Sequence, residues 1–180
     1  MEAALNLLTQ IHLLVLLGCS LLLPRPTTSA TAGNHTAPMP LSSCLPDQAS
    51  SLLRLKRSFV TTNYSTVAFR SWRAGTDCCR WAGVRCSSNS DDGGGRVTSL
   101  DLSDQGLESG GLDPAIFHLS SLERLNLAYN DFNGSQLPSS GFERLANLTH
   151  LNLSTSSFSG QVPASGIGGL TSLVSLDLST

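Results

Sequence analysis

The sequence is poor in aromatic residues and in charge. Aromatic residues make up 6% of its 180 residues and charged residues 13%. Eleven basic residues stand against thirteen acidic ones, so the composition predicts neither a nucleic-acid-binding patch nor a polyanionic surface. Few aromatic side chains fit a thin repeated coil better than a globule built around one large core.

Catalytic signatures are also missing. The sequence has no nucleophile elbow, no metal-spaced histidines and no carboxylate pair in a cleft-forming context. The glycine-rich stretch at residues 87–95 lacks the Gly-Lys-Ser/Thr of a phosphate-binding loop and is interpreted as a flexible connection. We therefore expect a protein that is no enzyme and that takes no cofactor or metal.

What the sequence does contain is a recurring pair of leucines. The pairs are spaced by 25, 26 and 25 residues, and they are Leu100 and Leu102, Leu125 and Leu127, Leu151 and Leu153, and Leu176 and Leu178. Within each pair the leucines alternate with a polar residue, which is the period of a strand with one buried face. A period in the twenties with L-x-x-L-x-L spacing is typical of a leucine-rich-repeat solenoid.

The repeats extend over residues 96–180. We predict an α/β solenoid, namely a right-handed leucine-rich-repeat coil with a parallel concave sheet and short convex 3-10 or loop segments. It would hold about three full repeats and one incomplete repeat. Further apolar positions are expected inside the coil or on its convex side: Leu107, Ile116, Leu119, Phe132, Leu145, Phe158, Ile167 and Leu170.

The amino-terminal segment indicates a targeting signal. Ile11 to Leu23 is an apolar run, and Ala30-Thr31-Ala32 fits the small-residue pattern of a signal-peptide cleavage site. We predict a signal peptide over residues 1–32 and a short leader over residues 33–43. The alternative is an uncleaved anchor, since Leu5 to Leu23 is about long enough to span a bilayer.

Cleavage would remove Cys19 and leave Cys44, Cys78, Cys79 and Cys86. Four cysteines in an exported chain indicate two disulfides. A bond between the adjacent Cys78 and Cys79 would be strained, which leaves two pairings open, and we favour Cys44–Cys78 with Cys79–Cys86. By loop-closure entropy these would contribute about 4 and about 2.5 kcal/mol. Zinc is disfavoured, because there is no Cys-x-x-Cys pair and no histidine at the right spacing.

Residues 44–95 are predicted to form a helical cap over the first repeat. Leu52, Leu55 and Phe59 fall on one face of a helix, and Asp47 is expected as its N-cap.

Two further groups of side chains complete the predicted cap. The basic side chains Arg54, Lys56 and Arg57 are expected to lie mostly toward water. Trp72 and Trp81 flank the two adjacent cysteines, and their large apolar area would cover the end of the solenoid.

The cap sequence carries a specific resemblance. C-L-P-D-Q-A-S-S-L-L-R-L-K-R-S-F begins at Cys44, and S-W-R-A-G-T-D-C-C-R-W-A-G-V-R-C ends at Cys86. Together with the following G-R-V-T-S-L-D-L-S, they resemble the amino-terminal cap of plant extracellular leucine-rich-repeat proteins. The resemblance covers Cys44 to Thr180 and is greatest to the receptor-like proteins, which join an ectodomain to one membrane span and a short tail without a kinase.

The resemblance also implies roles for individual residues. The family's asparagine ladder satisfies buried backbone groups at the turn after each strand, and Asn130 holds that position here, with Gln105 and Ser156 at the matching positions. Asn133-Gly134-Ser135 and Ser159-Gly160-Gln161 resemble the plant-type element that makes a second short strand.

Outward strand positions are expected to form a recognition surface. Short, varied polar side chains can hydrogen-bond a peptide, glycan or protein ligand, while the alternative is that they are only solvated strand residues. The residues favoured for a partner are Asp101, Ser103, Glu123, Arg124, Asn126, Tyr129, His150, Ser175 and Asp177. The same face is expected to carry Asp104, Ala128, Asn152, Ser154 and Ser179.

Five sequons predict N-glycosylation in an exported chain, at Asn34, Asn63, Asn133, Asn147 and Asn152. A glycan on Asn152 would obstruct the concave surface, so ligand contact is expected to avoid the third repeat or to use a lateral face. Glycopeptide mass spectrometry that found Asn152 unmodified would remove the reason for that restriction.

The resemblance implies a non-catalytic recognition ectodomain at the cell surface, in immune or developmental signalling. It would act with a ligand and a co-receptor, without nucleic acid, and would reach the membrane only through a segment absent from this chain. The alternatives are a soluble inhibitor of a hydrolase in the cell wall or apoplast, and an ectodomain piece of a receptor kinase. All three place the protein in the secretory pathway.

The last strand supplies a testable expectation. Leu176 and Leu178 have no capping segment after them, and terminal repeats normally need one, so we expect the chain to be a fragment. Expressed alone with its disulfides formed, it should self-associate or melt without cooperativity in scanning calorimetry. A monomer with a single cooperative transition would contradict the expectation.

Overall fold

The computed structural model describes residues 44–60, 62, 65–87 and 95–180. The predicted signal peptide and leader, residues 1–43, therefore lie outside the described residues, together with the sequon at Asn34. The sequon at Asn63 and residues 88–94 of the glycine-rich stretch also lie outside them.

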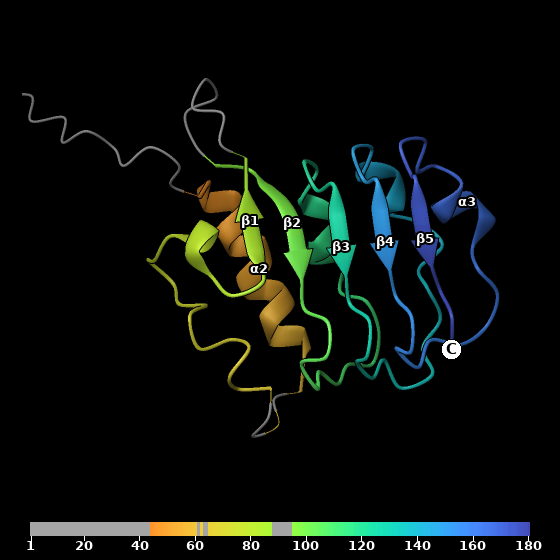
Figure 1. Ribbon diagram of the computed structural model, residues 1–180, viewed down its shortest axis with the longest axis horizontal. Helices are drawn as coiled ribbons and strands as arrows, with labels where there is room; N and C mark the ends of the chain where they lie inside the picture. The colour runs from red at the N-terminus through yellow and green to blue at the C-terminus, as the bar shows by residue number, and fades with distance from the viewer. Residues whose placement is uncertain (1–43, 61, 63–64, 88–94) are drawn as a thin grey trace, which may run out of the picture. The chain divides into compact units, whose positions relative to one another are not determined.

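One five-stranded sheet runs through the described residues, and its strands lie side by side in chain order (Figure 1). The strands are β1 (Val84–Cys86), β2 (Val97–Asp101), β3 (Arg124–Asn126), β4 (His150–Asn152) and β5 (Ser175–Asp177). The pairs from β2 to β5 are parallel, as the leucine pattern predicts. β1 pairs with β2 in the antiparallel sense, so the cap adds a strand that the repeat pattern does not predict.

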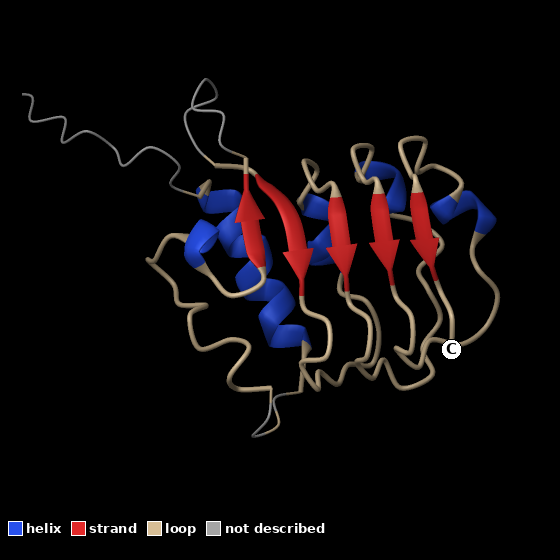
Figure 2. Cartoon of the chain, in the orientation of Figure 1, coloured by secondary structure: helices blue, strands red, loops and turns tan. Residues whose placement is uncertain are grey.

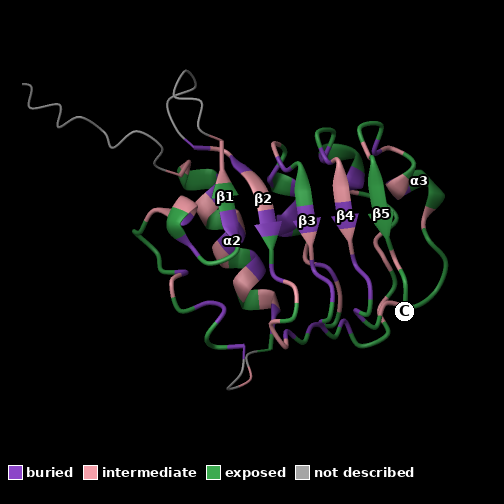
Figure 3. Cartoon of the chain, in the orientation of Figure 1, coloured by how far each residue is buried: buried purple, intermediate pink, exposed green. Residues whose placement is uncertain are grey.

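The paired leucines form the interior of the coil. Leu100, Leu125 and Leu151 stand in register on neighbouring strands and are at most 1% exposed. Figure 3 shows this buried band crossing the middle of β2, β3 and β4. Leu176 continues the same row but is 42% exposed, because no described residue packs beyond β5.

The opposite side of the coil carries short helical segments, which lie behind the strands in Figure 2. They are the 3-10 helices η4 (Pro114–His118) and η5 (Phe142–Arg144) and the short helix α3 (Ala164–Ile167). The side chain of Asp113 caps η4 by accepting from the backbone N–H of Ala115 at 2.7 Å. The predicted second strand is reduced to isolated bridges, among them Glu108–Asp131 and Gln136–Ser159.

Asn130 sits between two coils and satisfies buried backbone groups of both. Its amide nitrogen donates to the carbonyls of Leu102 and Leu127, at 2.8 and 2.9 Å, and more weakly to that of Ala128. Its side-chain oxygen accepts from the N–H of Leu107 at 3.0 Å. The residue is 6% exposed, so water could not replace these bonds.

The side chains at the two matching ladder positions, Ser156 and Gln105, make fewer hydrogen bonds to the backbone than Asn130 does. Ser156 is buried, and its single O–H is shared between the carbonyls of Leu127 and Ser154, at 2.8 and 3.1 Å. Gln105 is half-buried and donates to the carbonyl of Ser103 at 2.9 Å. Among the described residues, neither side chain accepts a hydrogen bond from a backbone N–H, as Asn130 does.

The cap helix α2 (Pro46–Ser58) buries Leu52 and Leu55 as its periodicity predicts. The predicted N-cap is wrong: Leu45 occupies that position without a side-chain bond, and Asp47 lies inside the first turn. Proline at the first helical position explains the shift, because its missing N–H and fixed φ suit the start of a helix.

Two polar side chains of α2 tie the cap together. Gln48 is 1% exposed, and its side-chain oxygen accepts from the N–H of Val97, at the start of β2, at 2.6 Å. Lys56 does not face water as predicted. Its ammonium donates to the carbonyls of Phe69 and Trp72, at 3.2 and 2.9 Å, and lies 5.8 Å from the centre of the Phe69 ring.

The two tryptophans are buried in the cap. Trp72 and Trp81 are 1% and 3% exposed, and their rings stack with centres 5.3 Å apart. Their indole N–H groups donate to the carbonyl of Ala82 and the hydroxyl of Thr76. Both belong to the same core cluster as the leucines of the first repeat, so the predicted covering role agrees with their position.

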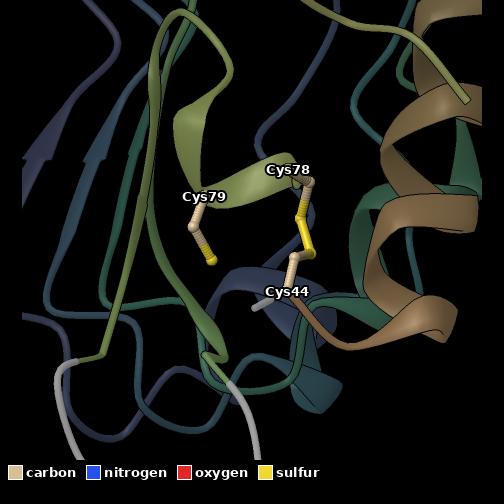
Figure 4. Close-up of side chains that lie close together, drawn as sticks. All are labelled: Cys44, Cys78 and Cys79. Carbon is tan, nitrogen blue, oxygen red and sulfur yellow. A yellow bond between two sulfur atoms is a disulfide. The ribbon is translucent and has the colours of Figure 1, made fainter. Parts of the chain in front are cut away.

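The cysteines are paired as Cys44–Cys78 and Cys79–Cys86, with Cα atoms 5.3 and 5.5 Å apart. Figure 4 shows the first bond beside Cys79. Three of the sulfur atoms lie within 4.8 Å of one another, but sulfurs in disulfides offer no thiolate to a metal. Asp77 braces the junction, because its carboxylate accepts from the N–H groups of Cys44 and Cys79.

The unequal roles of the ladder positions predict unequal stability losses. Asn130→Ala should lower the free energy of unfolding by about 3 kcal/mol, because it leaves several buried backbone groups unpaired. Ser156→Ala should cost about 1 kcal/mol, and Gln161→Ala, at an exposed position, less than about 0.5 kcal/mol. Native-state amide hydrogen exchange of the repeats measures all three losses, and equal losses for Asn130→Ala and Ser156→Ala would contradict this account of the ladder.

Candidate functional site

The side of the sheet that carries no helices presents two rows of side chains, each running across the strands. In-register pairing lines up the first, here called the basic row, as Arg85, Ser99, Arg124, His150 and Ser175. The second, here called the amide row, holds Asp101, Asn126, Asn152 and Asp177. The rows are two residues apart along each strand, or about 7 Å.

The amide row is held in place by its own repeat. Asp101 accepts from both the N–H and the hydroxyl of Ser103, and Asn152 accepts in the same way from Ser154. Asn126 accepts from the N–H of Ala128 at 3.2 Å. One side-chain oxygen in each is therefore occupied at the end of the strand, which orients the remaining polar atoms of the row.

Two hollows lie along this face. One of about 310 Å³ spans β2 to β5 and includes Arg124, His150 and Ser175 in its lining. A larger one of about 760 Å³ lies where the cap meets the repeats, and both Arg85 and Arg124 line it. Both hollows are lined mainly by polar residues and run along the sheet, which suits an extended ligand better than a compact one.

Most residues favoured from the sequence lie on this face. Exposed members are Asp101, Glu123, Arg124, Tyr129, Ser175 and Asp177, and half-buried members are Ser103, Asn126 and His150. Ala128 and Ser154 are corrections, since they are only 1% and 5% exposed. They lie past the strand end, where the chain turns back over the next coil, so neither offers a contact surface.

Tyr129 is held outward by its backbone. It is 60% exposed and has a φ of 57°, and Asp104 and Thr155 adopt the same left-handed conformation at the matching positions. In that conformation the N–H of Tyr129 donates to the carbonyl of Ser154 in the next coil at 3.0 Å. The geometry of the turn thus places whichever residue stands here at the edge of the face.

Arg85 is the residue that the sequence does not reveal. It belongs to the cap by sequence, yet its pairing with Ser99 extends the basic row by one strand. Gly83 permits this close approach, since it has a φ of 78° and a side chain there would collide with the carbonyl of Asp101. The Gly-Val-Arg-Cys segment is a signal for the strand, but only the pairing shows which face Arg85 joins.

The described sequons occupy different surfaces. Asn133 and Asn147 are exposed away from the two rows, whereas Asn152 is a half-buried member of the amide row. Asn147 donates to the carbonyl of Ser120 at 3.2 Å. Glycosylation of all three stays a prediction.

Comparison with known proteins identifies the architecture. Residues 45–87 match the leucine rich repeat N-terminal domain, and residues 95–158 match the leucine rich repeat. The chain belongs to the leucine-rich-repeat family. The chain is much shorter than its relatives and spans 16% of the length of Receptor-like protein 6 of Arabidopsis thaliana.

That relative is 39% identical over 165 residues, which cover 82% of this leucine-rich-repeat chain. Receptor-like protein kinase 7 of the same plant is 34% identical over 65% of the chain and 11% of its own length. Among solved structures, the ectodomain of the Arabidopsis receptor kinase HAESA, in complex with an IDA peptide hormone lengthened at its N-terminus, superposes with a TM-score of 0.61. It is 29% identical and covers 73% of this chain and 20% of that one.

The chain is thus homologous to plant receptor-like proteins, as its cap and repeats predict. Within the part of the chain that the structure describes, no helix is long and apolar enough to cross a bilayer.

The amide row yields a titration prediction. The N–H and hydroxyl of Ser179 both donate to Asp177, and these bonds to the charged form hold the pKa of that carboxyl below its usual value of 3.8. Since the folded pKa is the lower one, the associated stability is present above the unfolded pKa and is lost as the pH falls through the folded pKa. Ser179→Ala should raise the pKa of Asp177 in a carbon-detected NMR titration, whereas Ser172→Ala should not. A wild-type pKa at or above 3.8 would contradict the assignment.

Proposed function

We propose that this chain is the amino-terminal part of a non-catalytic recognition ectodomain and that it binds an extended peptide segment of its ligand on the two rows. The observation that carries the proposal is the in-register pair of polar rows on the open side of the sheet. A peptide lying across the strands can contact one side chain from each successive repeat. The chemistry is hydrogen bonding and charge pairing, with no reacting group required.

The rigidity of the face supports recognition. Leucines that are almost fully buried hold β2, β3 and β4 from beneath, and bonds from Ser103 and Ser154 orient two members of the amide row. A ligand therefore meets side chains that need little further ordering, which lowers the entropic cost of binding. The HAESA ectodomain, a structural neighbour, binds a peptide hormone, which supports a peptide as the ligand class.

The proposal extends to the whole protein. Relatives of the receptor-like type support secretion, display at the extracellular side of the plasma membrane, and signalling with a co-receptor in immunity or development. The similarity to Receptor-like protein kinase 7 supports the same binding role for the ectodomain of a receptor kinase. In either case the described residues act as a binding surface. Glycans on Asn133 and Asn147 would leave that surface open, whereas a glycan on Asn152 would cover the amide row at β4, so the proposal requires Asn152 to be unmodified.

A peptide-display experiment tests the proposal. The secreted chain, with its disulfides formed, is panned against a yeast-displayed library of random peptides of about twelve residues. We expect saturable selection of a peptide set, and Ser175→Trp should weaken binding of that set about tenfold or more by filling the hollow over β4 and β5. No enrichment above that obtained with the reduced, unfolded chain would contradict the proposal.

A matched control separates blocking from misfolding. Ala146→Trp introduces the same side chain at an exposed position outside both rows. It should leave peptide binding unchanged, and both variants should keep the far-ultraviolet circular-dichroism spectrum of the wild-type chain. Equal loss of binding in the two variants would place the peptide elsewhere on the chain.

A further inference from the structure

We infer that the hollow between the cap and the first two repeats is a subsite for an acidic group of a bound peptide, held between Arg85 and Arg124. The inference rests on the proposed function and adds the chemical class that the ligand presents at this end. Both arginines are exposed, both line the hollow, and Ser99 lies between them in the basic row. The cap is therefore part of the binding surface as well as a cover for the core.

The spacing suits one oxyanion shared by two guanidinium groups. Arg85 and Arg124 stand on strands that flank β2, two strand spacings or about 10 Å apart. Arginine side chains are long enough to converge over the small Ser99 between them. Guanidinium groups prefer carboxylates and similar oxyanions, which they hold with paired, charge-assisted hydrogen bonds.

Both arginines are available for such a partner. Among the described residues, Arg54 pairs with Asp113 and Arg80 with Asp77, whereas neither Arg85 nor Arg124 forms an ion pair. Asp101 and Glu123 line the same hollow, but Asp101 already accepts two bonds from Ser103. The arginines thus meet the hollow as two unpaired positive charges.

The neighbouring acids indicate a peptide in preference to a uniformly anionic polysaccharide. The amide row, with an acid at each end, runs about 7 Å from the basic row. The wider charge distribution agrees, since residues 44–96 carry eight basic and four acidic side chains and residues 97–180 carry two basic and eight acidic ones. A polyanion would be attracted by Arg85 and Arg124, but the carboxylates along the same face would repel it; these are Asp101, Glu123 and Asp177. A peptide can place an acidic side chain on the first row and amide or basic groups on the second.

The test uses the peptides enriched from the display library. Enriched sequences should carry Asp or Glu at a fixed position, and replacing that residue by Asn or Gln should weaken binding to the wild-type chain about tenfold or more. With the double variant Arg85→Gln/Arg124→Gln, the same replacement should change binding less than about twofold. This double-mutant cycle isolates the contact from general effects on folding.

Two control variants and a uniformly anionic ligand complete the experiment. Arg80→Gln and Arg144→Gln remove equal charge from exposed positions outside the hollow and should leave the tenfold effect intact. Oligogalacturonate of about twelve units is the uniform polyanion, and binding that depends on Arg85 and Arg124 would overturn the choice of a peptide. Enriched peptides that bind without an acid preference would overturn the subsite while leaving the proposed function standing.

Discussion

Burial of the leucine face by neighbouring coils is the constraint on which the rest of this structure depends. A strand of three to five residues cannot exclude water from its leucines, and only the next coil supplies the missing contacts. Leu100, Leu125 and Leu151 are almost fully buried, while Leu176, with one neighbouring coil, stays substantially exposed. Fixed stacking forces the strands into register, and register in turn lines up the outward side chains as rows.

The same constraint explains why the two ends of the described coil differ. At the amino-terminal end, α2, the stacked tryptophans and two disulfides cover the first repeat, and Gln48 joins the helix to the start of β2. The cap also completes the sheet with an antiparallel strand. The same segment therefore protects the core and extends the face that we propose for recognition, which is why Arg85 stands in one row with Arg124.

The need to hydrogen-bond buried backbone groups is the second constraint on which residues the coil can accept. Each coil turns inward after its strand, where buried carbonyl and N–H groups have no access to water. Asn130 meets this need with one donor and one acceptor group, and Ser156 meets part of it with a hydroxyl. The residue before the ladder position has a fixed left-handed backbone conformation, but its side chain points outward and can vary. Tyr129 is therefore available to a partner without a role in the core.

Patterns within the sequence were sufficient to predict the solenoid, its parallel sheet and the relation to plant leucine-rich-repeat proteins. Periodic leucines and the cap motif are local patterns, and their physical consequences do not depend on distant contacts. The pattern predicted the wrong N-cap, Asp47, because the proline before it occupies the first helical position and makes Leu45 the N-cap. Three features became visible only in the folded chain: Lys56 turns inward to backbone carbonyls, Ala128 and Ser154 are buried, and Arg85 joins the open face. Each of these depends on a pairing or packing partner far away in the chain, which periodicity within one segment cannot show.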